Sequence, residues 1–401
     1  MSQTCDIIST ICYAGSPQKT LFYIQGDTYM RKTILALTLV LALVLSGCGS
    51  LRLASAKAPD VVYSGGDMLR DPAPNCEAYP ALTGKLRDAI LAQEDIALQG
   101  WDTQVVAACL DELMADPGLF WVIGYHLTGS TGSNPTCQIT FRWLCDNGSA
   151  MYDEMCRKAD AILSEAPADD YGKALYLYDW LERNVTYAEA EGFDQSSYAA
   201  ICSGSAVCGG IADAYAFLLR RGGIEACTVM GSAIQKGETM SHAWNYAILD
   251  GAVYAFDLTW DNCDRYDTSG NEYLLHDWFA VTSDEISDTH IPSEDADKIT
   301  TAANANNYFI HNGYLLTDDS ADAVTAIWQQ QIGNGTGVLT LRCADESVYD
   351  AARLRLFDLS EAPTLLRRLG LASGETVTVN YTTLDLLHTI TIFLSPADSS
   401  L

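Results

Sequence analysis

The sequence has few basic residues for its length. Its 401 residues include 23 Lys and Arg against 52 Asp and Glu, a formal net charge of -29. Nucleic acids and anionic lipid surfaces repel such a chain, which argues against both as partners. Because 48% of the residues are hydrophobic, the chain can bury two or three cores and is not wholly disordered. We therefore expect a folded, acidic protein that does not bind nucleic acid.

Long hydrophobic runs are also scarce. The apolar run from Ile34 to Leu45 follows two basic residues and is shorter than the roughly 20 residues that a membrane-spanning helix needs. This arrangement predicts a secretory signal over residues 30–48. The run closes on Leu-Ser-Gly-Cys, which resembles the bacterial lipoprotein signal. We expect lipid attachment at Cys48, which would anchor the exported protein to the outer face of the bacterial cell membrane.

Two segments flank this signal. Residues 1–29 precede a complete signal, so we interpret them as a mis-annotated extension that starts before the true initiator, Met30. The alternative is a cytoplasmic extension that uses the apolar run as an anchor helix. Residues 49–66 are small and polar, which is typical of a tether.

The remaining chain is predicted to be α+β throughout. We expect an N-terminal α+β region over 67–165, a catalytic domain over 166–292 and a smaller C-terminal α+β domain over 303–401. Periodicity predicts helices at 83–98, 103–115, 149–164, 169–183, 319–331 and 346–356, and strands at 120–127, 138–144, 377–381 and 388–394.

Cysteine pairs at metal-binding spacing are missing. The chain has no CxxC pair and no Cys/His cluster typical of a zinc finger, so we expect no structural metal and no cofactor. If Cys208 is kept for chemistry, nine other cysteines follow Cys48. Because nine is odd, at least one stays unpaired.

The most informative segment begins at Cys208. From Ile211 apolar residues recur at helical spacing, and Gly222 can end the helix, so Cys208 is predicted at a helix N-terminus. Unpaired N–H groups and the positive end of the helix dipole stabilise a thiolate there. Ser203 or Ser205 could cap this helix.

A thiolate needs a proton partner, and the chain has only six histidines. Residues 240–249 and 252–260 predict two strands joined by the turn dipeptide Asp250-Gly251. With Leu249 facing Ala252, His242 lies diagonal to Asp257 on one face, within reach of a hydrogen bond. A turn of odd length would put the two side chains on opposite faces.

Three ordered motifs now point to a family. The runs Cys-Gly-Gly-Ile-Ala-Asp-Ala, His-Ala-Trp-Asn and Asp-Leu-Thr-Trp-Asp resemble the bacterial transglutaminase-like superfamily, which shares its core with papain-type cysteine proteases. The resemblance covers about residues 170–290. It implies a Cys-bearing helix packed on an antiparallel sheet, with Cys208 as nucleophile, His242 as base and Asp257 as orienting acid. Ile211 departs from the aromatic that the family often has there.

The implied reaction is attack of the thiolate on an amide carbonyl of a peptide or protein substrate, through a thioester that water or an amine resolves. The sequence does not decide between hydrolase and acyl transferase. The Cys208 N–H is one expected oxyanion donor. The second donor is not identified, and Gln195 and Tyr198 are interpreted as structural. The alternative function is a catalytically silent, surface-displayed binding module with the same fold.

Other conspicuous residues receive plainer interpretations. Trp244, Tyr254, Phe256 and Trp260 are expected to pack in the core of the hairpin. Acidic residues from Asp261 to Asp267 lack the EF-hand pattern and are interpreted as a solvated loop.

Overall fold

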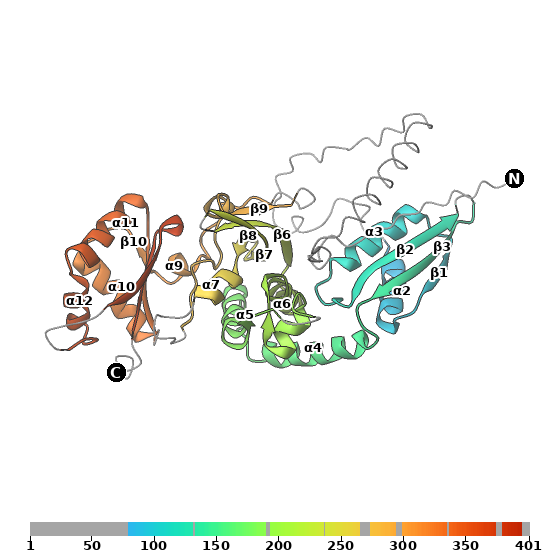
Figure 1. Cartoon of the computed structure of the whole chain (residues 1–401), viewed down its shortest axis with the longest axis horizontal. Helices are drawn as coiled ribbons and strands as arrows, with labels where there is room; N and C mark the ends of the chain where they lie inside the picture. The colour runs from blue at the N-terminus through green and yellow to red at the C-terminus, as the bar shows by residue number, and fades with distance from the viewer. Residues whose placement is uncertain are drawn as a thin grey trace, which may run out of the picture. The chain divides into compact units, whose positions relative to one another are not determined.

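The computed structural model describes residues 79–130, 133–189, 193–235, 237–264, 273–293, 299–334, 337–373 and 379–394. Expectations for residues 1–66, including the signal and Cys48, lie outside this part. Across the described ranges, no helix is both long and apolar enough to cross a membrane. Helices and strands are mixed throughout, which confirms the α+β class (Figure 1).

The N-terminal region is a three-stranded antiparallel sheet, ordered β1-β3-β2, with two helices. The predicted helix over 83–98 is wrong in its second half. Gln93 takes a left-handed conformation and ends the helix, and the next residues pair as a strand with β3. Its elements are α2 (Pro80–Ala92), β1 (Ile96–Gln99), α3 (Thr103–Met114), β2 (Val122–Ser130) and β3 (Thr136–Trp143).

The central sheet has the strand order β8-β7-β6-β9, and every pairing in it is antiparallel. Helix α6 packs against β6 and β7, so the Cys-bearing helix lies on an antiparallel sheet as expected. The strands of this sheet are β6 (Ala226–Gln235), β7 (Glu238–Leu249), β8 (Ala252–Phe256) and β9 (His290–Pro292). A separate parallel pair is formed by β4 (Thr186–Tyr187) and β5 (Ser205–Ala206). The helices are α4 (Gly148–Leu163), α5 (Asp170–Asn184), η3 (Ala199–Ser203), α6 (Cys208–Arg221), α7 (Leu258–Asp264) and α8 (Ser283–Ile286).

The hairpin register is confirmed, but its second strand is shorter than predicted. Leu249 faces Ala252 and the pairing runs to Asn245 opposite Phe256. The predicted strand over 252–260 is wrong beyond Phe256, because Leu258 begins the short helix α7. His242 therefore pairs with Gly231 of β6 and has no β8 residue opposite it.

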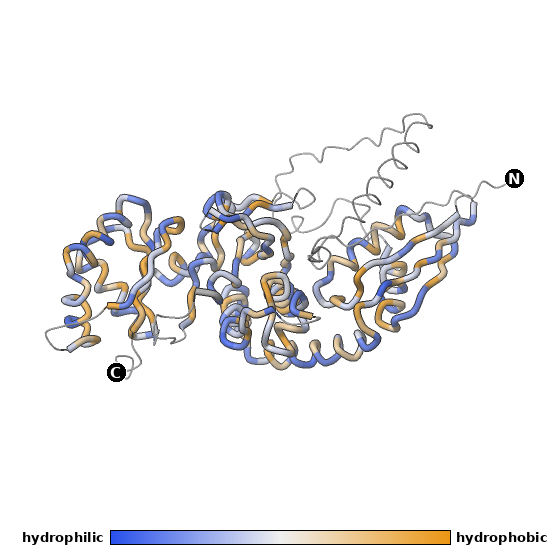
Figure 2. The backbone as a smooth tube through the Cα atoms, in the orientation of Figure 1, coloured by the Kyte–Doolittle hydropathy of each residue, from blue (hydrophilic) through white to orange (hydrophobic). Residues whose placement is uncertain are grey.

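The C-terminal domain contains a second four-stranded sheet, ordered β10-β11-β13-β12, that mixes one parallel pair with two antiparallel pairs. Apolar and polar residues interchange along its helices, as expected of elements with one buried face (Figure 2). Its elements are α9 (Tyr308–His311), β10 (Leu315–Leu316), α10 (Ala321–Gly333), β11 (Val338–Cys343), α11 (Glu346–Arg353), η4 (Leu354–Asp358), α12 (Ala362–Arg368), β12 (Asn380–Leu384), η5 (Asp385–Leu387) and β13 (Thr389–Phe393).

Candidate active site

Cys208 is the first residue of α6, and its side chain is half-buried. The first N–H groups of a helix have no partner inside the helix, so they remain available to an anion beside the sulfur. The predicted cap is wrong. Val207 occupies the cap position and offers no side-chain hydrogen bond, and neither Ser203 nor Ser205 replaces it. The amides at the start of α6 are thus not consumed by a capping side chain.

The two glycines after Cys208 are required by close neighbours. A Cβ atom at Gly210 would lie 2.5 Å from the carbonyl oxygen of Asp194 and 2.9 Å from that of Ser196. A Cβ atom at Gly209 would lie 2.5 Å from Oε1 of Gln195. The segment before the helix therefore folds over its first turn, and the Gln195 amide group lies against the backbone that follows the thiol.

His242 and Asp257 are in direct contact. Nε2 of His242 lies 2.7 Å from Oδ2 of Asp257, and both side chains are 3% exposed. The Cys208 thiol lies close enough to the same imidazole to contribute to its raised pKa. Asp257 follows β8 immediately, and its other oxygen, Oδ1, accepts the backbone N–H of Trp260 at 3.2 Å. The three residues singled out from the sequence thus meet, in the order thiol, imidazole, carboxylate.

The charges of this cluster reinforce each other. Burial lowers the pKa of His242, but the Asp257 charge and the hydrogen bonds to Asp257 and Cys208 outweigh burial and raise it to about 10. Burial acts on Asp257 in the opposite sense, toward a higher pKa. The charges and hydrogen bonds of His242 and His290 prevail and hold the Asp257 pKa well below its ordinary value. At neutral pH the pair is therefore an imidazolium and a carboxylate.

Aromatic rings enclose the His242 imidazole. Trp260 stacks on it with ring centroids 5.5 Å apart, and Trp244 lies 6.3 Å away. Both tryptophans are buried, as are Tyr254 and Phe256, which confirms their expected place in the core. Such apolar walls lower the local dielectric and strengthen the electrostatic interactions inside the cluster.

The sequence missed one member of this cluster, His290. Its Nε2 lies 2.9 Å from Oδ2 of Asp257, the oxygen that His242 also contacts, and its side chain is 0% exposed. In the sequence, His290 lies two residues before the predicted end of the catalytic domain at residue 292. Because the chain has only six histidines, each of them was a candidate for the site. Only the pairing of β9 with β6 shows that His290 lies next to Asp257.

Asp261 corrects another expectation. It is 1% exposed rather than part of a solvated loop. Its carboxylate accepts from the Tyr178 hydroxyl at 2.6 Å and from the backbone N–H groups of Asp277 and Trp278 at 3.1 Å. Burial and the Asp277 charge raise the pKa of Asp261 well above its ordinary value. The hydrogen bonds of Asp261 therefore connect α7 to α5 and to the segment that contains Asp277 and Trp278.

Two clusters in the described part of the chain bring candidate metal-ligating atoms within 4.8 Å of one another. One is His242, Asp257 and His290, and the other is Asp179, Glu182 and His276. In both clusters the close approach of these atoms is explained by hydrogen bonds within the chain. In the second cluster His276 contacts Asp179 at 2.8 Å, and Glu182 accepts the Leu275 N–H at 2.8 Å. We assign no metal to either cluster.

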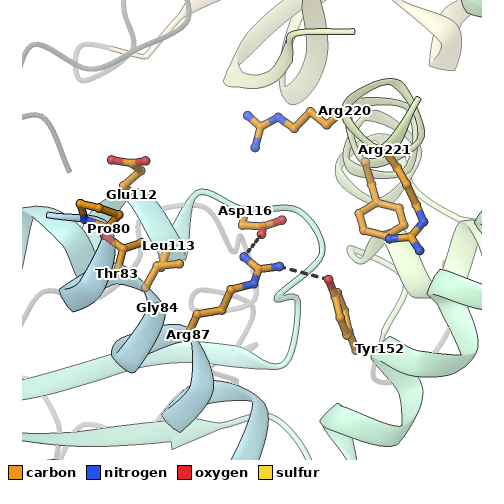
Figure 3. A pocket seen from close by; sticks show the side chains of 11 residues that line it. Pro80, Thr83, Gly84, Arg87, Glu112, Leu113, Asp116, Tyr152, Arg220 and Arg221 are labelled. Atoms are coloured by element: carbon orange, nitrogen blue, oxygen red, sulfur yellow. Dashed lines mark hydrogen bonds and ion pairs between the residues drawn. The ribbon is translucent and has the colours of Figure 1, made fainter. Parts of the chain in front are cut away.

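A cavity of about 580 Å³ lies beside Arg220 and Arg221, at the C-terminal end of α6 (Figure 3). Arg87, Asp116 and Tyr152 line it and are joined by hydrogen bonds of 2.8 and 3.0 Å. Arg220 lines it from α6, 12 residues after Cys208. At 1.5 Å per residue, this is about 18 Å along the helix. The cavity is therefore not part of the Cys208 site.

Comparison with known proteins identifies the segment that holds this cluster. Residues 157–260 match the model of the transglutaminase-like superfamily. No match was found among curated proteins. This segment contains the Cys208 helix, the His242 strand and Asp257. Over residues 157–260 the chain is thus similar to the transglutaminase-like superfamily, and this similarity supports a cysteine-dependent enzyme in general terms.

Solved structures give weaker likenesses. One is a candidate cysteine protease from Cytophaga hutchinsonii, with 20% identity over 33% of this chain and 56% of that chain and a TM-score of 0.24. Another is a TGase, with 14% identity over 47% of this chain and 58% of that chain and a TM-score of 0.23. The chain thus spans little more than half the length of either protein. No activity is carried over from them.

Proposed function

We propose that the protein is an extracytoplasmic thiol enzyme that cleaves or transfers acyl groups of peptide or protein amides. The single observation that carries this proposal is the contact of the Cys208 thiol with an imidazole whose pKa is raised to about 10. An imidazolium beside a thiol at a helix N-terminus stabilises the thiolate, which is the nucleophilic form.

In this mechanism the Cys208 thiolate attacks the amide carbonyl, and the carbonyl π electrons move to the oxygen. His242, oriented by Asp257, then gives its proton to the leaving amine as the C–N bond breaks and a thioester remains. Water or an amine, deprotonated by His242, resolves the thioester. The backbone N–H of Cys208 is one proposed oxyanion donor.

The first test concerns the nucleophile. The mature protein and a Cys208→Ala variant are incubated with a peptide library, with and without a primary amine, and the products are identified by mass. Products made only by the unaltered protein support the proposal, and products common to both proteins refute it. Gains in mass that depend on the amine would select transfer, whereas gains of water would select hydrolysis.

A second test needs no substrate. An activated thiolate reacts with iodoacetamide at neutral pH ahead of ordinary thiols, so peptide mapping should find Cys208 labelled first. Cys202 and Cys227 are partly exposed cysteines and serve as internal references. Labelling of Cys208 no faster than of these two would favour a silent binding module over an enzyme.

The location is a separate proposal. The signal over 30–48 supports export and lipid attachment at Cys48, with residues 49–66 as the tether. A Cys48→Ala variant should leave the membrane fraction of the producing cells, or accumulate with its signal uncleaved. A variant that fractionates and is processed like the unaltered protein would contradict this part of the proposal.

A further inference from the structure

Two histidines converge on one oxygen of Asp257. Nε2 of His242 lies 2.7 Å from Oδ2, and Nε2 of His290 lies 2.9 Å from the same atom. The pKa of Asp257 is depressed, so this group is an ionised carboxylate at neutral pH and can only accept hydrogen bonds. Both histidines therefore donate to Oδ2 through an N–H.

The other ring nitrogen of His290 also has a partner. Nδ1 lies 2.9 Å from the hydroxyl of Thr289, which in turn lies 3.2 Å from the carbonyl oxygen of Ile286. Because both ring nitrogens are engaged, the plane of the His290 ring is set from two sides. A ring held in this way presents its Nε2–H to Asp257 in one fixed direction.

The backbone of β9 keeps His290 in place. Residue His290 pairs with Ala233 and Pro292 with Gly231, so β9 forms an edge of the sheet that carries His242. A Cβ atom at Gly231 would lie 2.3 Å from the carbonyl oxygen of Ile291, so only glycine permits this approach. Trp260 covers the ring with centroids 4.7 Å apart. The pairing of β9 with β6 and the packing of Trp260 therefore hold the His290 ring next to Asp257.

We propose that His290 is a positioning residue that acts on the reaction through Asp257. A carboxylate held only by His242 and by one backbone N–H can turn about its side-chain bond. A second donor on Oδ2 prevents this rotation and so holds the His242 ring in line with Cys208. The inference rests on the proposed function, because it assigns His290 a task in activating the same thiol.

The test compares His290→Phe, which removes the donor but keeps a ring, with His290→Gln, which restores an N–H at a similar distance. The rate of Cys208 alkylation by iodoacetamide is measured from pH 5 to pH 9 on the folded mature protein. For His290→Phe we expect a loss of about tenfold or more at pH 6, the size typical for a supporting partner, and a higher pH midpoint. His290→Gln should recover most of the rate.

A matched control is available in the same domain. His276 contacts Asp179 at 2.8 Å and is 9% exposed, so His276→Phe also removes a mostly buried histidine from a carboxylate. This variant should lower the melting temperature and leave the pH profile of Cys208 unchanged. A His290→Phe protein with the unaltered profile would overturn the inference, as would a His290→Gln protein that is no faster than His290→Phe.

If His290→Phe does not fold, Thr289→Val decides the question. It removes the hydroxyl that sets the ring plane from Nδ1 and so loosens the contact of His290 with Asp257, so a lower rate at pH 6 supports the inference and an unchanged rate overturns it. Failure of the proposed function has a different signature. In that case Cys208 of the unaltered protein reacts no faster than Cys208 of a His242→Gln variant.

Discussion

The side-chain amide of Asn245 on β7 donates to the carbonyl oxygen of Ala212 on α6 at 2.8 Å. The same Nδ2 also donates to the carbonyl oxygen of Cys227 on β6 at 3.2 Å. Asn245 lies three residues after His242, and Ala212 lies four residues after Cys208. This amide therefore joins the strand that carries the imidazole to the helix that carries the thiol.

Replacing Asn245 should cost stability. Asn245→Leu keeps a similar volume but leaves buried carbonyl oxygens of Ala212 and Cys227 without this donor, at a cost of about 1–3 kcal/mol. Urea denaturation measures the loss. Asn184→Leu is the matched control, because Asn184 makes a 2.7 Å bond from its amide to the carbonyl oxygen of Trp180 at an exposed position. Equal losses in the two variants would contradict the linking role of Asn245.

The charge of Asp257 should control the reactivity of Cys208. Asp257→Asn removes the charge that raises the pKa of His242, so the imidazolium is lost at lower pH and the thiolate with it. We expect alkylation at pH 7 to fall at least about tenfold, since one pKa unit corresponds to a factor of ten. Asp160→Asn removes the exposed partner of Arg221 and should leave the rate unchanged. A rate in Asp257→Asn equal to that of the unaltered protein would exclude this role.

The His242 pair should also make stability depend on pH. The folded-state pKa of His242 is about 10, above its ordinary value of 6.5. The folded state therefore binds the proton more tightly than the unfolded state. The resulting stabilisation is complete below about pH 6.5 and is lost as the pH rises toward 10. The unfolding free energies of the protein and of His242→Gln, measured by urea denaturation from pH 6 to pH 9.5, should converge across this range. A constant difference would contradict the raised pKa.

The first turn of α6 should not accept a methyl group. Gly210→Ala places Cβ 2.5 Å from the carbonyl oxygen of Asp194, so the backbone must shift, at about 1–3 kcal/mol for an overpacked site. The same change at Gly84, in the middle of α2, meets no atom within 4 Å and should stabilise the protein by up to about 1 kcal/mol. Urea denaturation of both variants checks the opposite signs. A stabilised Gly210→Ala protein would refute the close packing.

Local pattern alone determined much of the architecture. Apolar spacing placed α3, α4 and α5 within a residue or two, and the Asp250-Gly251 turn set the register of the hairpin, because both signals act between residues close in the chain. The same logic failed where a strand pattern ran past Phe256. There the chain forms α7, and the buried carboxylate of Asp261 in this helix accepts a hydrogen bond from the Tyr178 hydroxyl, 83 residues away in the sequence.

The sequence by itself determined the α+β class, the position of Cys208 at a helix start and the proximity of His242 to Asp257. Only the tertiary structure decided that His290 shares the same carboxylate oxygen, that Gln195 lies over Gly209, and that Asn245 ties α6 to the sheet. Each of these contacts joins residues on different elements. Periodicity and turn chemistry report the face on which a side chain lies, whereas its partner across such a distance depends on how the elements pack.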